Sequence, residues 1–300
     1  MRTTTVIDKR FRALVLGNAG LEKLFSGLRW GEGPVYFGDG DYYLCSDIPN
    51  DRMLQWAEGM GLRDFRKPSN YSNGNARDRQ GRLVSCEHGG RRVTRTEYDG
   101  SLTVLAERHK GGRLNSPNDL AVKSDGSIWF TDPIYGIKSE YEGFKTEREQ
   151  DGCFVYRIDP GSGALEAVLD DFSQPNGLAF SPDESKLYVA DTGASEDPAG
   201  PRHIRVFELG AGGRPRGGRV FAVCEGGLFD GFRFDTAGNL WTSAGSGVSC
   251  YASDGTLLGR IEIEETVTNL CFGGPKRNRL FITAQTSVYA MFVNAAGAGS

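Results

Sequence analysis

The sequence predicts an all-β fold, a six-bladed β-propeller built from four-stranded antiparallel blades. The chain of 300 residues repeats one phrase six times: a polar residue opens a hydrophobic strand, a turn rich in Asp and Gly follows, and a second hydrophobic strand completes it. The second strands end 40, 45, 59, 53 and 40 residues apart, at Asp47, Glu87, Asp132, Asp191, Ala244 and Ala284. A period of about 40 to 50 residues with strand-like alternation and no sustained helical stripe is typical of propeller blades.

The residue that opens the first strand is the fixed point of each copy. Where the turn contains Gly, that Gly follows the opening residue at a constant distance, as in Glu32 with Gly40 and Asp230 with Gly238. The opening residues are Glu32, Asn73, Asn118, Asn176, Asp230 and Thr268. This constant phase indicates that the six residues are structurally equivalent.

The remaining strands can be assigned within this frame. In the third unit the four strands read DLAV, SIWFTD, CFVYRI and LEAVLDD, whereas the sixth unit stops after SVYAMFV, one strand short. We expect residues 21–28 (LEKLFSGL) to supply the missing strand and close the ring, because closure removes exposed sheet edges. Residues 1–300 are therefore interpreted as one domain, with an N-terminal arm (1–20), six blades (21–294) and a tail (295–300).

Composition limits the classes of function. The net charge of −4 has interspersed signs, which argues against nucleic acid as a partner. There is no apolar run of 18 residues and no signal-peptide pattern, so we expect no membrane segment and a cytoplasmic location. The six cysteines have no close pairing, which favours free thiols in a reducing compartment. A monomer or small homo-oligomer is expected.

The six opening residues predict a metal site. Equivalent positions of a propeller are related by rotation, so these side chains can converge at one end of the central tunnel. Carboxylates and amide oxygens suit one divalent cation, Ca²⁺ first, since calcium tolerates irregular oxygen coordination; Mg²⁺, Mn²⁺ and Zn²⁺ remain possible. The competing interpretation is that Asn and Asp merely open strands by satisfying turn backbone groups. Glu, Asn, Asn and Asp at one phase of a closed repeat favour the metal.

Four motifs resemble one known family. GEGPVYF around Glu32, SPNDLAV around Asn118, QPNGLAFSPD around Asn176 and FDGFRFDTAGNLW around Asp230 resemble the SMP-30/gluconolactonase family, and the similarity spans residues 24–293. That family consists of six-bladed propeller lactonases with one divalent metal in the tunnel. The resemblance implies that Glu32, Asn118, Asn176 and Asp230 are metal ligands and that Asp230 is also the general base.

The expected activity is hydrolysis of a sugar lactone. In this mechanism the metal polarises the lactone carbonyl and Asp230 takes a proton from the attacking water. A phosphotriester hydrolase using the same metal and fold is the alternative, because polarising P=O resembles polarising C=O. A non-enzymatic propeller with structural calcium is a third possibility, from a different class.

Further residues are candidates for substrate binding. They lie beside the ring or at strand ends that point toward the tunnel: Asn73, Asn75, His88, Arg113, Asn115 and Tyr135. His88 could contact substrate or be a structural loop histidine. Several sugar lactonases of the family carry Arg two residues before the Asn that matches Asn118, whereas this chain has Ser116, so we expect sugar recognition to be built differently. Residues 134–150 form a long insertion, either a lid over the tunnel or a solvated loop.

Overall fold

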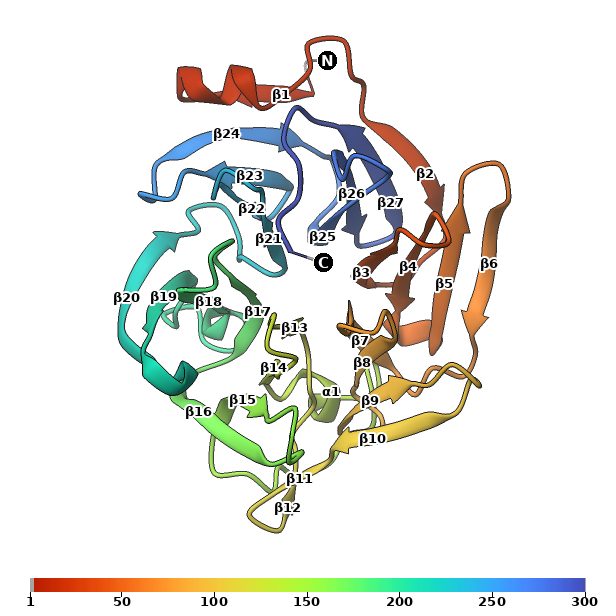
Figure 1. Ribbon diagram of the computed structural model, residues 1–300, viewed down its shortest axis with the longest axis vertical. Helices are drawn as coiled ribbons and strands as arrows, with labels where there is room; N and C mark the ends of the chain where they lie inside the picture. Colours follow the sequence, from red (N-terminus) through yellow and green to blue (C-terminus); the bar gives the residue numbers. More distant parts are fainter. Residues whose placement is uncertain (1–2, 300) are drawn as a thin grey trace.

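The computed structural model describes residues 3–299 and has six blades arranged around a central axis (Figure 1). Each blade is an antiparallel sheet whose first strand lies nearest the axis and whose later strands lie progressively farther out. The predicted six-bladed propeller is therefore confirmed. Helices are short, and within residues 3–299 none has the length and apolar character needed to cross a membrane.

The strands follow the six predicted units in chain order. Blades I to III comprise β3 (Gly31–Phe37), β4 (Tyr42–Asp47), β5 (Arg52–Ala57), β6 (Gly61–Arg66); β7 (Ser72–Arg77), β8 (Leu83–Glu87), β9 (Arg92–Thr96), β10 (Leu102–Ala106); and β13 (Leu120–Val122), β14 (Ile128–Asp132), β15 (Cys153–Ile158), β16 (Leu165–Phe172). Blades IV to VI comprise β17 (Pro175–Phe180), β18 (Lys186–Asp191), β19 (His203–Leu209), β20 (Pro215–Val223); β21 (Phe232–Phe234), β22 (Leu240–Ser243), β23 (Gly247–Tyr251), β24 (Leu257–Glu262); and β25 (Val267–Gly273), β26 (Arg279–Ala284), β27 (Ser287–Phe292), β2 (Glu22–Ser26).

Smaller elements lie at the periphery and between the blades. They are β1 (Thr4–Val6), the hairpin β11 (Arg108–His109) and β12 (Gly112–Arg113), the helix α1 (Tyr135–Lys138) and the 3-10 helices η1 (Lys9–Ala13), η2 (Ile48–Asn50), η3 (Gly193–Ser195) and η4 (Ala211–Gly213).

The N-terminal segment closes the ring. Strand β2 pairs antiparallel with β27, with Glu22 opposite Ala290 and Ser26 opposite Ser287, which confirms the strand expected within residues 21–28. Strand β1 also adds a fifth strand to blade V by pairing with β24, an arrangement that the sequence did not reveal. The fully buried Phe11 that follows packs its ring 5.9 Å from that of Trp241. The arm is thus held by both backbone pairing and core packing.

Each inner strand is irregular next to its opening residue. In blades I, II, IV and VI the register of the inner strand against its neighbour shifts within three residues. The shifts fall between Glu32 and Val35, Ser72 and Asn75, Pro175 and Leu178, and Val267 and Asn269. In blades III and V the ladder begins only at Leu120 and Phe232, after the opening residue. Such bulges bend a strand and re-aim its side chains. In blades I, II, IV and VI the bulge therefore lets the opening residue leave the regular alternation, and in blades III and V that residue lies outside the ladder.

Glycines directly after four opening residues allow neighbouring blades to approach closely. A Cβ atom added at Gly33 would lie 1.9 Å from the Asn73 carbonyl oxygen, and one at Gly177 would lie 2.1 Å from the Asp230 carbonyl oxygen. Gly74 N–H donates to the Asn118 carbonyl oxygen of the next blade at 2.7 Å. The opening residues are thus tied to one another around the axis by backbone contacts.

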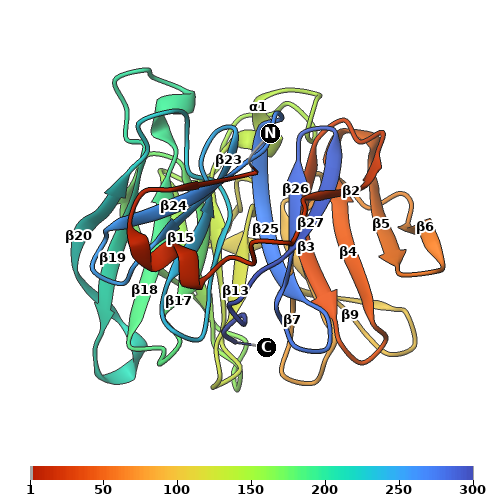
Figure 2. The ribbon, with the colours of Figure 1, turned by 90° about the horizontal axis from the view of Figure 1, so that it is seen from above.

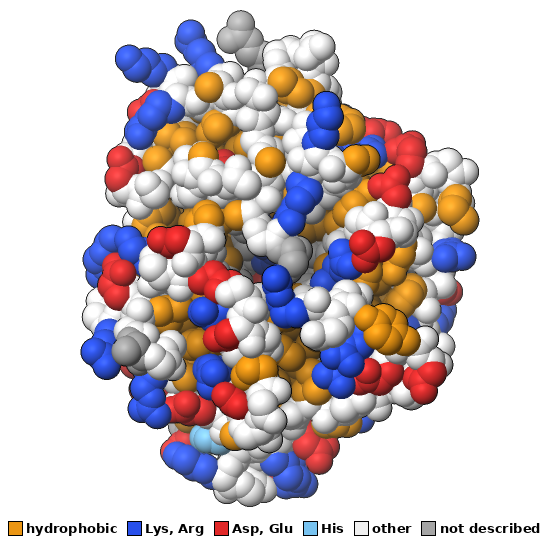
Figure 3. Space-filling model, viewed as in Figure 1, with side chains coloured by type: hydrophobic (Ala, Val, Ile, Leu, Met, Phe, Trp, Pro, Cys, Tyr) orange, Lys and Arg blue, Asp and Glu red, His pale blue; other side chains and the backbone are white. Residues whose placement is uncertain are grey.

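The two ends of the tunnel differ. The insertion that contains α1 lies at one end, and the C-terminal segment lies at the other (Figure 2). At the C-terminal end the surface is hollowed near the axis (Figure 3), where a cavity of about 240 Å³ is lined by all six blades and by Ala298 and Gly299. The tail is fixed there by backbone pairing of Gly297 with Asp235. The insertion therefore covers the end of the tunnel opposite to the tail.

Candidate metal centre and active site

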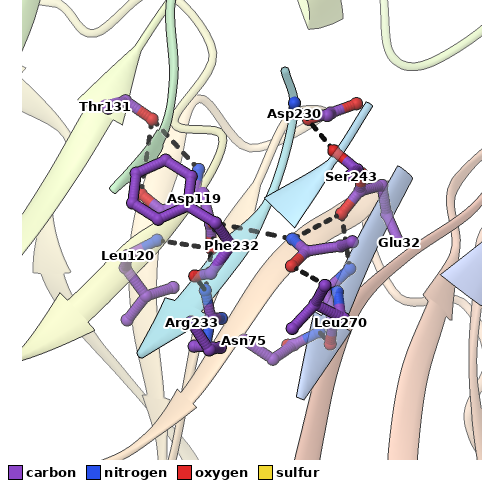
Figure 4. A network of polar contacts seen from close by, with 12 residues as sticks. Glu32, Asn75, Asp119, Leu120, Thr131, Asp230, Phe232, Arg233, Ser243 and Leu270 are labelled. Carbon is purple, nitrogen blue, oxygen red and sulfur yellow. Dashed lines mark hydrogen bonds and ion pairs between the residues drawn. The ribbon is translucent and has the colours of Figure 1, made fainter. Parts of the chain in front are cut away.

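The four predicted metal ligands open the inner strands of four different blades. Glu32, Asn118 and Asn176 are buried, with only 4 to 6% of their surface exposed, and Asp230 is half-buried. Backbone bonds fix their positions: Asp230 N–H donates to Ser243 Oγ at 2.8 Å (Figure 4), and Asn118 N–H donates to the Thr131 carbonyl oxygen at 2.8 Å. The side chains of Asn176 and Asp230 interact, and the charges of Glu32 and Asp230 influence one another. The structure therefore brings acidic and amide oxygens together at one place.

Two oxygens of this group lack partners. Glu32 Oε2 accepts hydrogen bonds from Gly33 N–H at 2.7 Å and from Asn269 Nδ2 at 3.0 Å. Glu32 Oε1 and Asn176 Oδ1 are buried and have no hydrogen-bond partner among residues 3–299. A buried oxygen without a donor costs about 1–3 kcal/mol, so such atoms call for a ligand.

The electrostatics of the group point the same way. Burial, together with repulsion from Asp119, raises the pKa of Glu32, and burial with repulsion from Glu32, Asp119 and Glu142 raises the pKa of Asp230 well above its ordinary value. Within the described chain, Arg233 lies 3.7 Å from Asp119, but Glu32 and Asp230 form no ion pair. A divalent cation would neutralise these carboxylates and satisfy the unpartnered oxygens.

The donor set fits a hard cation. Residues 3–299 contain no cluster of three or more His, Cys, Asp and Glu side chains arranged to hold a metal. The predicted set has two carboxylates, and its other two donors are amide oxygens. Oxygen donors of this mixture suit Ca²⁺, and imidazole or thiolate ligands, which favour Zn²⁺, are absent from the set. The residues present therefore fit the expected calcium ion.

Two further residues belong to this network and were missed from the sequence. Asn269 Nδ2 donates to Glu32 Oε2 and lies 3.4 Å from Asp119 Oδ2, so it links the two carboxylates. Asp119 lies beside Arg233 (Figure 4). Burial raises the pKa of Asp119, and the positive charge of Arg233 opposes that shift. Both residues directly follow an opening residue, at the position that is Gly in the other four blades. Reading the repeat one residue further would have identified them.

Asn73 and Asn75 have different surroundings. Asn73 Nδ2 lies 3.2 Å from His88 Nε2, and its side chain is at the ring position of blade II. Asn75 is fully engaged within the protein: its Nδ2 donates to the Gly33 and Asn73 carbonyl oxygens and to Ser46 Oγ, each at 2.9 Å. Asn75 therefore ties blade II to blade I.

His88 is completely buried beneath the insertion. Its Nδ1 lies 3.2 Å from the Glu142 carbonyl oxygen, and its Nε2 faces the Asn73 amide. Burial lowers the pKa of His88 to about 4. A neutral ring that donates from Nδ1 to the Glu142 carbonyl and accepts at Nε2 from Asn73 satisfies both contacts. His88 thus joins the insertion to the ring.

Arg113 and Asn115 support the loop before Asn118. Arg113 Nη2 donates to the Gly90 carbonyl oxygen at 2.7 Å. Asn115 Nδ2 donates to the carbonyl oxygens of Asp132 and Gly152, and its backbone N–H donates to Asp132 Oδ2 at 2.8 Å. Asp132 thus caps this loop. The guanidinium of Arg113 and the side-chain amide of Asn115 both donate to backbone carbonyl oxygens.

Ser116 and Tyr135 anchor the start of the insertion. Ser116 Oγ donates to the Pro133 carbonyl oxygen at 2.6 Å and accepts from Gly136 N–H at 3.0 Å. The Tyr135 hydroxyl contacts Thr192 Oγ1 at 2.6 Å and Ser195 Oγ at 2.9 Å. Thr192 Oγ1 also lies 3.5 Å from Asn176 Nδ2, so Tyr135 is connected to a predicted metal ligand through one residue.

The rest of the insertion reaches the other side of the tunnel. The Tyr141 hydroxyl donates to the Arg29 carbonyl oxygen at 3.3 Å, and the Phe144 ring meets that of Tyr71 edge-on with centroids 5.2 Å apart. Residues 134–150 therefore make contacts with blade IV at one end and with Arg29 and blade II further along. They lie at the end of the tunnel opposite to the C-terminal tail (Figure 2).

The fold is a six-bladed propeller whose blade-opening residues include a group of acidic and amide side chains. The chain belongs to the SMP-30/gluconolactonase/LRE-like family, whose model matches residues 30–286. The resemblance seen in the four sequence motifs is thereby confirmed.

Relatives with known names span nearly the whole chain. A gluconolactonase of Zymomonas mobilis is 34% identical, over 95% of this chain and 84% of its own length. A pentonolactonase of Haloferax volcanii is 29% identical, over 85% of this chain and 81% of its own. The solved structure of a Xanthomonas campestris gluconolactonase superposes with a TM-score of 0.91 at 38% identity, and covers 97% of this chain and 94% of that one.

Proposed function

We propose that this enzyme hydrolyses a sugar lactone to the corresponding aldonic acid, and that Glu32, Asn118, Asn176 and Asp230 bind one divalent cation, Ca²⁺ by preference. The observation that carries the proposal is the pair of buried oxygens, Glu32 Oε1 and Asn176 Oδ1, that have no hydrogen-bond partner, beside the carboxylates of Glu32 and Asp230, which form no ion pair within residues 3–299. The relatives named gluconolactonase and pentonolactonase support the choice of substrate.

In lactone hydrolysis the bound cation, Asp230 and the insertion would have separate roles. A bound divalent cation supplies Lewis-acid polarisation of the lactone carbonyl. Asp230, ionised when a cation offsets the repulsion from Glu32, accepts a proton from the water that attacks the carbonyl carbon. The C–O bond of the ring then breaks, and the ring oxygen leaves as a hydroxyl group after taking up a proton. The insertion 134–150 limits access of bulk water to the ring end of the tunnel.

The test is a substrate panel with and without chelator. We expect hydrolysis of γ- or δ-aldonolactones, loss of the activity with excess chelator, and recovery on adding Ca²⁺. A phosphotriester in the same panel tests the alternative activity. Chelator-insensitive turnover, turnover of the phosphotriester alone, or no turnover of any lactone would contradict the proposal.

A variant tests the role of the base. Asp230→Asn should lower kcat by about 100-fold or more, because a positioned general base contributes about 10²–10⁴-fold. Asp99→Asn, at an exposed turn, is the matched control and should keep full activity. Full activity of Asp230→Asn at saturating Ca²⁺ would remove Asp230 from this role.

The cellular setting belongs to the same proposal. All six cysteines are free and buried, which suits a reducing cytoplasm. We expect the small lactone to be the main partner.

A further inference from the structure

Glu142 is the one acidic side chain of the insertion that faces the ring. Its charge contributes to the repulsion that raises the pKa of both Glu32 and Asp230, so its carboxylate lies within electrostatic reach of two predicted metal ligands. These two residues open blades I and V, on different sides of the axis. Its Oε2 lies 3.9 Å from His88 Nδ1, and the other nitrogen of that ring lies 3.2 Å from Asn73 Nδ2, so the carboxylate is connected to the ring position of blade II through one residue.

The carboxylate of Glu142 is available to a ligand. Its backbone carbonyl accepts from His88, but neither carboxylate oxygen has a hydrogen-bond partner among residues 3–299. The nearest basic group is His88 Nδ1, 3.9 Å from Oε2, and burial keeps that ring neutral. The side chain is only 21% exposed, and burial raises its pKa to about 7. The carboxylate oxygens are not among the fully enclosed atoms, so they can accept hydrogen bonds from water or from a ligand.

The backbone at Glu142 is firmly positioned. A Cβ atom at Gly136 would lie 2.5 Å from His88 Cβ, and one at Gly143 would lie 2.1 Å from the Gly136 carbonyl oxygen, so the insertion is packed closely on itself and on blade II. Tyr141 is held on the other side, where the Arg29 guanidinium lies 5.1 Å from the centre of its ring. Glu142 is thus an acceptor on a fixed support, as a recognition residue requires.

A metal ion and a substrate are the two candidate ligands for this carboxylate. The four predicted metal ligands lie at the starts of inner strands, whereas Glu142 lies in the insertion between β14 and β15. A substrate bound between the ring and the insertion would meet Glu142 on the side opposite to the metal ligands. The hydroxyl groups of a sugar are hydrogen-bond donors, and hydrogen bonds to a carboxylate are stronger than those between neutral groups. An unsubstituted lactone offers no such donor.

We propose that Glu142 binds hydroxyl groups of the substrate and makes the site selective for polyhydroxylated lactones over unsubstituted ones. This inference rests on the proposed lactonase function. It assigns to the insertion the recognition role that Ser116 cannot fill, since the Ser116 hydroxyl is occupied by Pro133 and Gly136.

The experiment compares two six-membered lactones, D-glucono-1,5-lactone and δ-valerolactone, with the Ca²⁺-loaded enzyme. Glu142→Ala should lower kcat/KM for gluconolactone by about tenfold or more, mainly through KM, because a charge-assisted hydrogen bond is lost. Its kcat/KM for valerolactone should change by less than about twofold. Glu142→Gln, which keeps the shape and one acceptor, should show a smaller loss. Glu147→Ala, at an exposed position of the same insertion, is the matched control.

Other outcomes would contradict the inference or the function on which it rests. Equal losses on both lactones, or weaker Ca²⁺ binding by Glu142→Gln in a calorimetric titration, would overturn the inference and assign Glu142 to the metal or to the chemical step. Unchanged kinetics on both substrates would also overturn it, while leaving the lactonase function intact. If the unmodified enzyme hydrolyses neither lactone, the proposed function itself fails.

Discussion

Gly177→Ala perturbs the ring without touching any side chain that binds or reacts. The new Cβ atom would lie 2.1 Å from the Asp230 carbonyl oxygen, whereas ordinary contacts begin at 3.4 Å, so the two inner strands must separate by about 1.3 Å. The atom in the way is backbone, and Gly177 does not have a positive φ, so the effect is purely steric. Overpacking costs about 1–3 kcal/mol. We therefore expect the free energy of unfolding to fall by about 3 kcal/mol.

The functional consequence should be larger than the loss of stability suggests. Displacing a catalytic group by about 1 Å can cost about 100-fold in rate. Urea unfolding and kcat with an aldonolactone, both at saturating Ca²⁺, measure the two effects. Gly38→Ala is the control, because a Cβ atom there meets nothing within 4 Å. If Gly177→Ala matched Gly38→Ala in both assays, the close approach of the strands would not be what positions Asp230.

Three further substitutions test which contacts stabilise the propeller around the site. Burial alone would raise the pKa of Glu265, but hydrogen bonds from the β26–β27 hairpin outweigh it and lower the pKa to about 2. Glu265→Gln should therefore destabilise by about 2 kcal/mol at pH 7, and the difference should vanish as pH falls from about 4.5 toward 2; a pH-independent difference would be contrary evidence. Asn75→Asp replaces three donated hydrogen bonds by a buried charge and should cost about 3 kcal/mol or more in urea unfolding, against no change if Asn75 is peripheral. Phe11→Ala should cost about 3–5 kcal/mol, whereas an arm that contributes nothing would leave stability unaltered.

The repeat made the fold and its closure predictable from the sequence. Alternation of apolar residues fixed which strands belong together, and the missing fourth strand of the last unit pointed to residues 21–28. Strand β1 was not predictable in this way, because its three residues, Thr4–Val6, are mostly exposed and carry no repeat. Its position depends on the edge of β24, a tertiary feature.

The site was predictable only where the repeat constrains it. The opening residues share one phase, so their common location followed from symmetry. Asp119 and Asn269 share the next phase, but the other four blades have glycine at that position, so the repeat shows no common polar side chain there. Glu142 lies in an insertion without a counterpart in other blades, so its direction depends on packing against His88 and Gly136.

A calorimetric titration of Ca²⁺ into chelator-treated protein tests the central claim most directly, because it measures the metal centre without assuming a substrate. We expect one bound ion per chain, with affinity at least about tenfold weaker in Glu32→Gln and Asp230→Asn, since each removes one of two carboxylate ligands. Asp99→Asn should titrate like the unmodified protein. Absence of binding, or equal affinity in all four proteins, would contradict a cation held by the opening residues of the blades.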